Sequence, residues 1–188
     1  MNPPSLPALP APAVPAVLRV TAAACIVAAL GGCSPAFNWR DARFENAGLT
    51  ALLPCKPDRG SKPVVMAGRP VTLSMMGCEA GGAMFAVAMV DAGDAGKVTE
   101  VLANWQAATL ANIRAAPATN AVPLKLAGAS TAPAPSLVTA RGQSANGKVV
   151  MSQAAYFVQG SQVFQAVVYA EKVNPEASDA FFSGLRLQ

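Results

Sequence analysis

The sequence predicts an α+β domain in which an antiparallel sheet is covered by one long and one short helix. Short apolar segments alternate with polar residues or run continuously, as strands do. Turn pairs such as Gly81-Gly82 and Asn146-Gly147 separate neighbouring segments closely enough for hairpins. Two further segments repeat their apolar residues at helical spacing. Because hairpins pair strands antiparallel, these patterns favour α+β over a doubly wound parallel sheet.

The first half of the sequence supplies one set of strands. We expect strands at residues 37–44, as an edge strand, and at 49–53, 64–66, 71–78 and 84–90. Residues 54–60 contain two prolines and a glycine, which predicts a loop. Alternation in the fourth strand places Val71, Leu73 and Met75 on one face of the sheet. The predicted strands therefore meet at turns and loops short enough for antiparallel neighbours.

A long helix is expected from Asp94, which can cap it, to the residue before Pro117. The residues at helical spacing that form its buried stripe are Val98, Val101, Leu102, Trp105, Thr109 and Ile113. The opposite side carries Lys97, Glu100, Asn104, Ala107, Ala111 and Arg114. Trp105 could serve as a ligand platform, but we expect it in the core because burying an indole removes a large apolar area from water.

The second half repeats the pattern of strands followed by a helix. The expected elements are a short strand at 124–126, a surface loop at 131–135, strands at 137–142, 148–158 and 162–170, and a final short helix. That helix opens with Asn174 as its cap, Pro175 at the first helical position and Glu176 in the first turn. Ala177, Phe181 and Leu185 would then share its buried face, and Gly184 can end it.

The apolar segment 20–30 ends at Leu30-Gly31-Gly32-Cys33. Arg19 gives it a positive flank, and the run is shorter than the roughly 20 residues that a membrane span takes. These residues resemble the lipobox of bacterial lipoproteins, in which the cysteine sulfur receives a diacylglycerol and the chain is cut just before that cysteine. The resemblance implies lipidation of Cys33. An uncleaved N-terminal anchor and an ordinary signal peptide with an unmodified cysteine are the alternatives.

This interpretation divides the chain into three parts. Residues 1–32 form a disordered leader and lipoprotein signal peptide, residues 33–46 a lipidated tether with an edge strand, and residues 47–188 a single α+β domain. The lipid on Cys33 would hold the domain on a membrane in the cell envelope, facing the periplasm. Ser34 follows the cysteine. An aspartate at this position would resemble an inner-membrane retention signal, so its absence favours the outer membrane.

The four cysteines of the sequence predict one disulfide. Cys25 is lost with the signal peptide and Cys33 is lipidated, which leaves Cys55 and Cys78 in an oxidising compartment. Each of the two ends a predicted strand, and antiparallel neighbours bring such positions within the bridging range of about 4.4–6.8 Å between Cα atoms. We expect a disulfide between them. Two separate buried thiols and a redox pair are the alternatives.

No histidine occurs in the sequence, which removes Ser-His-Asp and Cys-His nucleophile systems and the usual zinc and haem ligand sets. A paired-carboxylate site is conceivable among Glu79, Asp91, Asp94 and Glu100, although capping and solvated helix positions explain these residues better. A copper surface is conceivable among Met66, Met75, Met76, Met84 and Met89, although core filling is the usual role of methionine. We therefore predict no catalytic residue, no cofactor and no metal.

The net charge of +4 comes from scattered basic residues that are not interleaved with aromatic ones. This pattern gives no support to a nucleic-acid partner. The membrane, through Cys33, is the expected partner, together with an envelope protein.

Several short motifs resemble one known structural class. They are a strand ending Leu52-Leu53-Pro54-x-Lys56-Pro57, an Ala-rich central helix, the strand 160–165 and the terminal Phe181-Phe182-Ser183-Gly184-Leu185-Arg186. Together they resemble small bacterial proteins of the PsbP-like α/β/α class, in which helices cover an antiparallel sheet. The resemblance implies a fold, and members of that class act largely as accessory or assembly proteins.

These observations lead to one expected function and one alternative. We expect a non-enzymatic envelope lipoprotein that acts as an interaction or assembly module at a membrane face. The alternative is a small-ligand carrier, or a carboxylate-dependent hydrolase, with a pocket between the sheet and the helix.

Overall fold

The computed structural model of the protein describes residues 36–45, 47–116 and 121–188. Ala36–Gln188 forms one compact unit. The described part of the expected tether, residues 36–45, therefore packs as part of the domain. The predicted leader, the lipobox and Cys33 lie outside the described residues.

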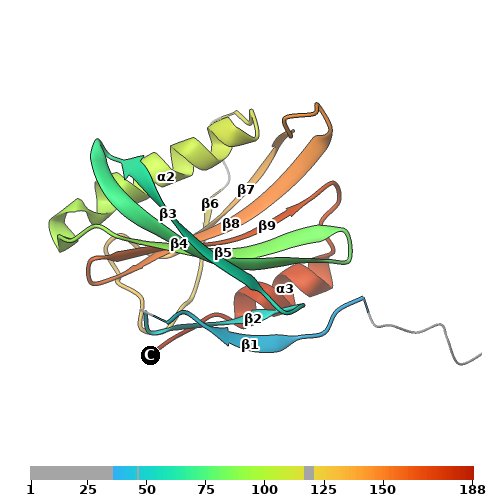
Figure 1. Ribbon diagram of the computed structural model, residues 1–188, viewed down its shortest axis with the longest axis horizontal. Coiled ribbons are helices and arrows are strands. Elements are labelled where there is room, and N and C mark those ends of the chain that lie inside the picture. The colour runs from blue at the N-terminus through green and yellow to red at the C-terminus, as the bar shows by residue number, and fades with distance from the viewer. Residues whose placement is uncertain (1–35, 46, 117–120) are drawn as a thin grey trace, which may run out of the picture. The chain divides into compact units, whose positions relative to one another are not determined.

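A seven-stranded antiparallel sheet forms the centre of this unit, with the strand order β3-β4-β5-β9-β8-β7-β6 (Figure 1). Its strands are β3 (Asp58–Met66), β4 (Arg69–Ala80), β5 (Ala83–Asp91), β6 (Ala121–Pro123), β7 (Ser136–Gln143), β8 (Val149–Gln159) and β9 (Gln162–Ala170). Short turns join β3 to β4, β4 to β5, β7 to β8 and β8 to β9. The predicted α+β class, with antiparallel pairing and two covering helices, is confirmed.

Helix α2 (Val98–Asn112) covers one face of this sheet and follows a short 3-10 helix, η1 (Ala95–Lys97). Helix α3 (Pro175–Ser183) lies on the other face together with a small sheet of three strands (Figure 1). The small sheet has the order β1-β2-β10 and consists of β1 (Arg40–Arg43), β2 (Leu49–Leu53) and β10 (Arg186–Leu187). As predicted, β1 is an edge strand.

Two hydrophobic cores lie on the two faces of the large sheet. One packs the sheet against α3 and the small sheet, and its aromatic residues include Phe85, Phe157, Phe164 and Phe181. The rings of Phe157 and Phe164 stack with their centroids 5.1 Å apart. The other core packs the sheet against α2. The central strands β5, β8 and β9 are buried on both faces, which explains their nearly continuous apolar sequences.

The predicted stripe of α2 is confirmed, because all six of its residues are buried and the six on the opposite side are exposed. The predicted limits were too wide. The Asp94 carboxylate accepts a hydrogen bond from the amide of Gly96 and caps η1, so α2 itself begins at Val98. At the other end Arg114 adopts a left-handed conformation with φ of 51°, which stops the helix before Pro117.

Three strands differ from the prediction. Strand β3 starts at Asp58, inside the segment predicted as a loop. It is an edge strand with mostly exposed side chains, so its sequence has no apolar alternation, and an edge tolerates Pro63. The prediction of a short strand at 124–126 is wrong. Strand β6 lies just before that segment, and because all three β6 residues are exposed, its sequence shows no apolar pattern. Strand β10 has two residues, too few for a pattern to show.

Strand β4 extends beyond the part of the sheet that α2 covers. Leu73 packs in the core beneath α2, whereas Met75, predicted on the same face, is 41% exposed. Met76 is buried in the core on the opposite face, so Met75 shares the face of Leu73 as predicted, but it does not fill the core. This uncovered region of the sheet contains the groove described below.

Candidate functional site

A disulfide joins Cys55 to Cys78, as predicted, with their Cα atoms 6.0 Å apart. The predicted reason for the pairing was wrong. Cys55 follows β2 of the small sheet and Cys78 lies in β4 of the large sheet, so the two are not on neighbouring strands. The bond instead ties the two sheets together and encloses the edge strand β3.

An open groove with a volume of about 650 Å³ lies beside this disulfide. Its lining residues are Cys55, Lys56, Asp58, Arg59, Gly60, Met75, Met76, Gly77, Cys78, Glu79, Met84 and Ala86. No residue of α2 is among them. The groove therefore lies beside the helix-covered region and not between the sheet and α2, where the alternative function places its pocket.

The shape of the groove follows from the pairing of β4 with β5. Gly77 lies directly opposite Ala86, so two of the smallest side chains form the floor. Met75 and Met84, which are 41% and 44% exposed, flank this pair on the same face of the sheet. A Cβ atom at Gly77 would lie only 2.8 Å from the carbonyl oxygen of Phe85. The floor at residue 77 therefore has no room for a side chain.

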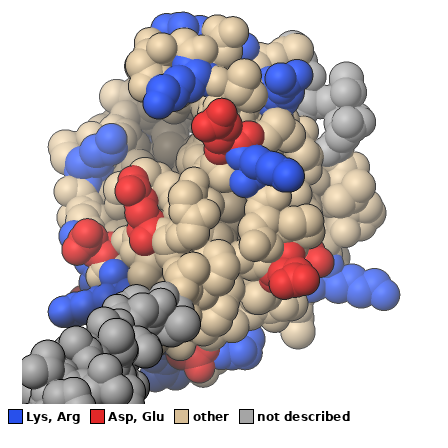
Figure 2. All heavy atoms as spheres, turned by 90° about the vertical axis from the view of Figure 1, so that its right-hand side faces the viewer, with Lys and Arg blue, Asp and Glu red and all other residues tan. Residues whose placement is uncertain are grey.

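Charged residues of both signs surround this apolar floor. Lys56, Asp58, Arg59 and Glu79 are exposed, and all four line the groove. On the face shown in Figure 2, basic and acidic side chains are likewise interspersed. An apolar floor with a few polar groups at its edge is typical of a binding surface.

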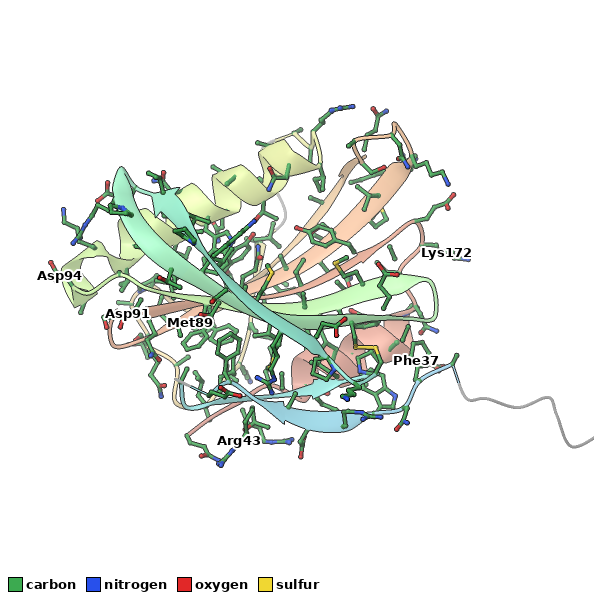
Figure 3. The ribbon with its side chains drawn as sticks, viewed as in Figure 1. Phe37, Arg43, Met89, Asp91, Asp94 and Lys172 are labelled. Carbon is green, nitrogen blue, oxygen red and sulfur yellow. A yellow bond between two sulfur atoms is a disulfide. The ribbon has the colours of Figure 1, made fainter. Side chains whose placement is uncertain are left out.

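The structure does not bring the four candidate carboxylates together. Glu79 pairs with Met84 near one end of β5, whereas Asp91 lies at the other end of that strand. The Asp91 carboxylate accepts a hydrogen bond from the amide of Gly93, at 2.8 Å. Figure 3 places Asp91 and Asp94 at the same end of the domain. Their local hydrogen bonds agree with loop and capping roles.

Glu100 likewise has a local partner, because its carboxylate lies 3.7 Å from the Lys97 amine on the exposed side of the helix. Within residues 36–45, 47–116 and 121–188, no three His, Cys, Asp or Glu side chains are grouped so that they could hold a metal ion.

The methionines divide between the core and the surface. Met76 and Met89 are buried in the core on the α3 side of the sheet, and Figure 3 shows Met89 in the interior. Met66 packs against the other core, beneath α2. Met75 is exposed and Met76 is buried, so these two neighbours on β4 point to opposite faces of the sheet. The five methionines do not converge on one surface.

A second polar feature lies buried beneath α2. The Gln165 side-chain amide donates hydrogen bonds to the hydroxyl oxygens of Thr109, at 2.8 Å, and Tyr156, at 2.9 Å. The Thr109 hydroxyl in turn donates to the carbonyl oxygen of Trp105 one turn earlier. Each of these side chains is nearly inaccessible to water and each has a partner. The network therefore fixes how α2 sits on β8 and β9.

Two tyrosines on this face have raised pKa values. Burial raises the pKa of the Tyr156 hydroxyl, against the smaller opposing effect of its hydrogen bonds to Thr109 and Gln165. Burial also raises the pKa of Tyr169 to about 12, with a further contribution from Tyr156, while a hydrogen bond with Ser152 opposes it. Both phenols therefore keep their protons near neutral pH and act as hydrogen-bonding groups.

Sequence reasoning missed both the groove floor and the polar network. The signals for the network were present, because Gln165 interrupts an apolar strand and Thr109 lies in an apolar helix stripe. The signal for the floor was weaker, because the pairing of Gly77 with Ala86 depends on the register of two strands.

The sequence matches no known family and no curated protein. Among solved structures it is similar to PA94 from Pseudomonas aeruginosa, a candidate regulator of unknown function, with 14% identity and a TM-score of 0.35. That alignment covers 74% of this chain and 85% of the other. A likeness at this level supports no inference about function. In the part of the chain that the structure describes, no helix is long and apolar enough to cross a bilayer.

Proposed function

We propose that this chain is an envelope lipoprotein, anchored through a lipid on Cys33, that acts as a non-enzymatic interaction or assembly module at a membrane face. The groove beside the disulfide is the observation that carries this proposal. Its Gly77–Ala86 floor and flanking methionines can make apolar contacts with a partner, and its charged edge can orient that partner. Methionine-flanked surfaces adapt to the shape of what they bind, which suits a protein partner.

Two features support the proposed location. The motif Leu30-Gly31-Gly32-Cys33 resembles a lipobox, and the Cys55–Cys78 disulfide suits an oxidising compartment. The outer membrane is favoured over the inner one by Ser34. The resemblance to PsbP-like proteins, many of which assist other proteins, agrees with an accessory role.

The size of the groove favours one second candidate function. A volume of about 650 Å³ lies within the roughly 300–1,000 Å³ range of small-ligand pockets. A small-ligand carrier would use the same Met75, Met84 and Ala86 surface. What binds there, protein or small molecule, separates the two functions.

Lipidation is tested by metabolic labelling with palmitate. The wild-type protein is expected to give a labelled band in the membrane fraction, and Cys33→Ser is expected to lose that label because the acceptor sulfur is gone. Cys25→Ser is the matched control and should keep the label. Label retained in Cys33→Ser, or a mature protein whose N-terminal sequence still starts at Met1, would refute the lipobox.

The binding surface is tested by filling the groove. Ala86→Met adds a flexible side chain over the floor, where Ala86 is partly accessible, and is expected to reduce at least tenfold whatever co-purifies with the detergent-extracted protein. Ala107→Met adds the same side chain to the exposed side of α2 and should leave co-purification unchanged. Mass spectrometry of the eluate identifies a specific protein or a small molecule. Equal recovery from both variants would mean that the groove is not the binding site.

A further inference from the structure

We propose that one end of the domain lies directly against the membrane surface, namely the end formed by the β4–β5 turn, the β7–β8 turn and the residues that follow β9. This inference rests on the proposed lipid anchor at Cys33 and adds to it the surface that faces the lipid. It commits to the headgroup region of a bilayer as the partner of this end.

The first step is that Phe37 is fixed to the domain. Its ring packs against Trp39, with the centroids 5.7 Å apart, and against Phe85. A Cβ atom added to Gly81 would lie only 2.5 Å from the Phe37 ring, so this ring sits directly on the β4–β5 turn. The next residue is also held, because the Asn38 amide donates to the carbonyl oxygen of Pro54, at 2.7 Å.

The second step is chain length. Only Ser34, Pro35 and Ala36 separate Cys33 from Phe37. Four residue steps of fully extended chain reach about 14 Å at most, whatever their conformation. A nine-residue strand such as β5 is about 30 Å long. The Cα atom of Cys33 therefore stays within about 14 Å of the Cα atom of Phe37, which is about half the length of such a strand.

The third step is that several segments share this end of the sheet. Ala83, just after the β4–β5 turn, pairs with Ala170 at the end of β9, and Ala170 pairs with Met151 near the start of β8. The β7–β8 turn lies beyond that pair. Figure 3 shows Phe37 and Lys172 at this end and Asp91 and Asp94 at the opposite end.

The side chains at this end suit contact with lipid headgroups. Val149, beside the β7–β8 turn, is an exposed apolar residue, at 37%. Lys148 and Lys172 are exposed at this end, and long cationic side chains can lie along an apolar surface while reaching phosphates. Glu79 and Glu171 are also exposed there, so electrostatic attraction to anionic lipid is not the main contribution to membrane contact. Figure 2, which faces this end, shows the mixed charges.

The test measures the distance from the membrane at the two ends of the lipidated, full-length protein. Lys172→Cys and, at the far end beside Asp94, Ala95→Cys replace exposed residues and accept a fluorophore after reconstitution into phosphatidylethanolamine–phosphatidylglycerol vesicles. A nitroxide on a fraction of the lipid headgroups quenches fluorophores close to the surface. We expect quenching at residue 172 to exceed quenching at residue 95 at least threefold.

A lengthened linker provides the control. Inserting twelve Gly and Ser residues between Pro35 and Ala36 should reduce the quenching at residue 172, because the chain no longer limits the distance. Equal or reversed quenching at the two ends of a protein that carries palmitate would overturn the orientation while leaving the anchor intact. If neither cysteine variant nor the parent protein incorporates palmitate, the proposed anchor itself is overturned.

Discussion

Replacing Trp105 by alanine is expected to lower the free energy of unfolding by about 3–5 kcal/mol, the usual cost of deleting a large buried aromatic side chain. Only 6% of Trp105 is exposed, and its indole lies in the core between α2 and the sheet. The carbonyl of the same residue accepts the hydrogen bond of Thr109, which belongs to the network with Gln165. The substitution leaves a cavity next to this network.

Urea denaturation of the mature domain, followed by circular dichroism, measures this loss. Asn104→Ala is the matched control, because Asn104 is exposed and is the neighbour of Trp105 on the same helix. Its effect should stay within about 0.5 kcal/mol, as is usual for surface substitutions. A Trp105→Ala variant as stable as this control would show that the indole faces water.

Removing the disulfide is expected to cost roughly 3 kcal/mol. Cys55 and Cys78 are 23 residues apart, and closing a loop of this size removes entropy from the unfolded chain by about that amount. Both cysteines are replaced by serine, because replacing only one would leave the other as a free thiol. The double variant should unfold at a lower urea concentration than the oxidised parent.

Non-reducing mass spectrometry of the mature protein supplies the independent check. A pair of peptides joined through Cys55 and Cys78 is expected from protein extracted without reductant. Reduction of the parent should lower its stability to nearly that of the double variant, because both lack the same covalent link. Two freely alkylated cysteines in the extract would contradict the bridge.

The elements that could be predicted from the sequence are those whose pattern is local. The buried stripe of α2 and the caps of Asp94 and Asn174 depend on residues within a few positions of one another, and the structure contains all of them. Strands 84–90 and 162–170 were predictable because their apolar runs are long.

The features that could not be predicted depend on distant pairing. Strand β3 is an exposed edge whose partner, β4, supplies the regularity that its own sequence lacks. The disulfide was predicted from the compartment and from counting cysteines, and its true geometry, across two sheets, required the fold. The groove floor exists only because the register places Gly77 opposite Ala86. None of these relations is a periodicity along the chain.

The small sheet joins the two ends of the described chain. Strand β2 pairs with β10, Arg186 forms an ion pair with Asp41, and the Arg43 guanidinium donates a hydrogen bond to the Gln188 side chain. The two side-chain contacts link residues that are 145 positions apart, so the sheet closes only after residues 186–188 have left the ribosome. This arrangement delays completion of the fold until residues 186–188 are available to pair with the N-terminal strands.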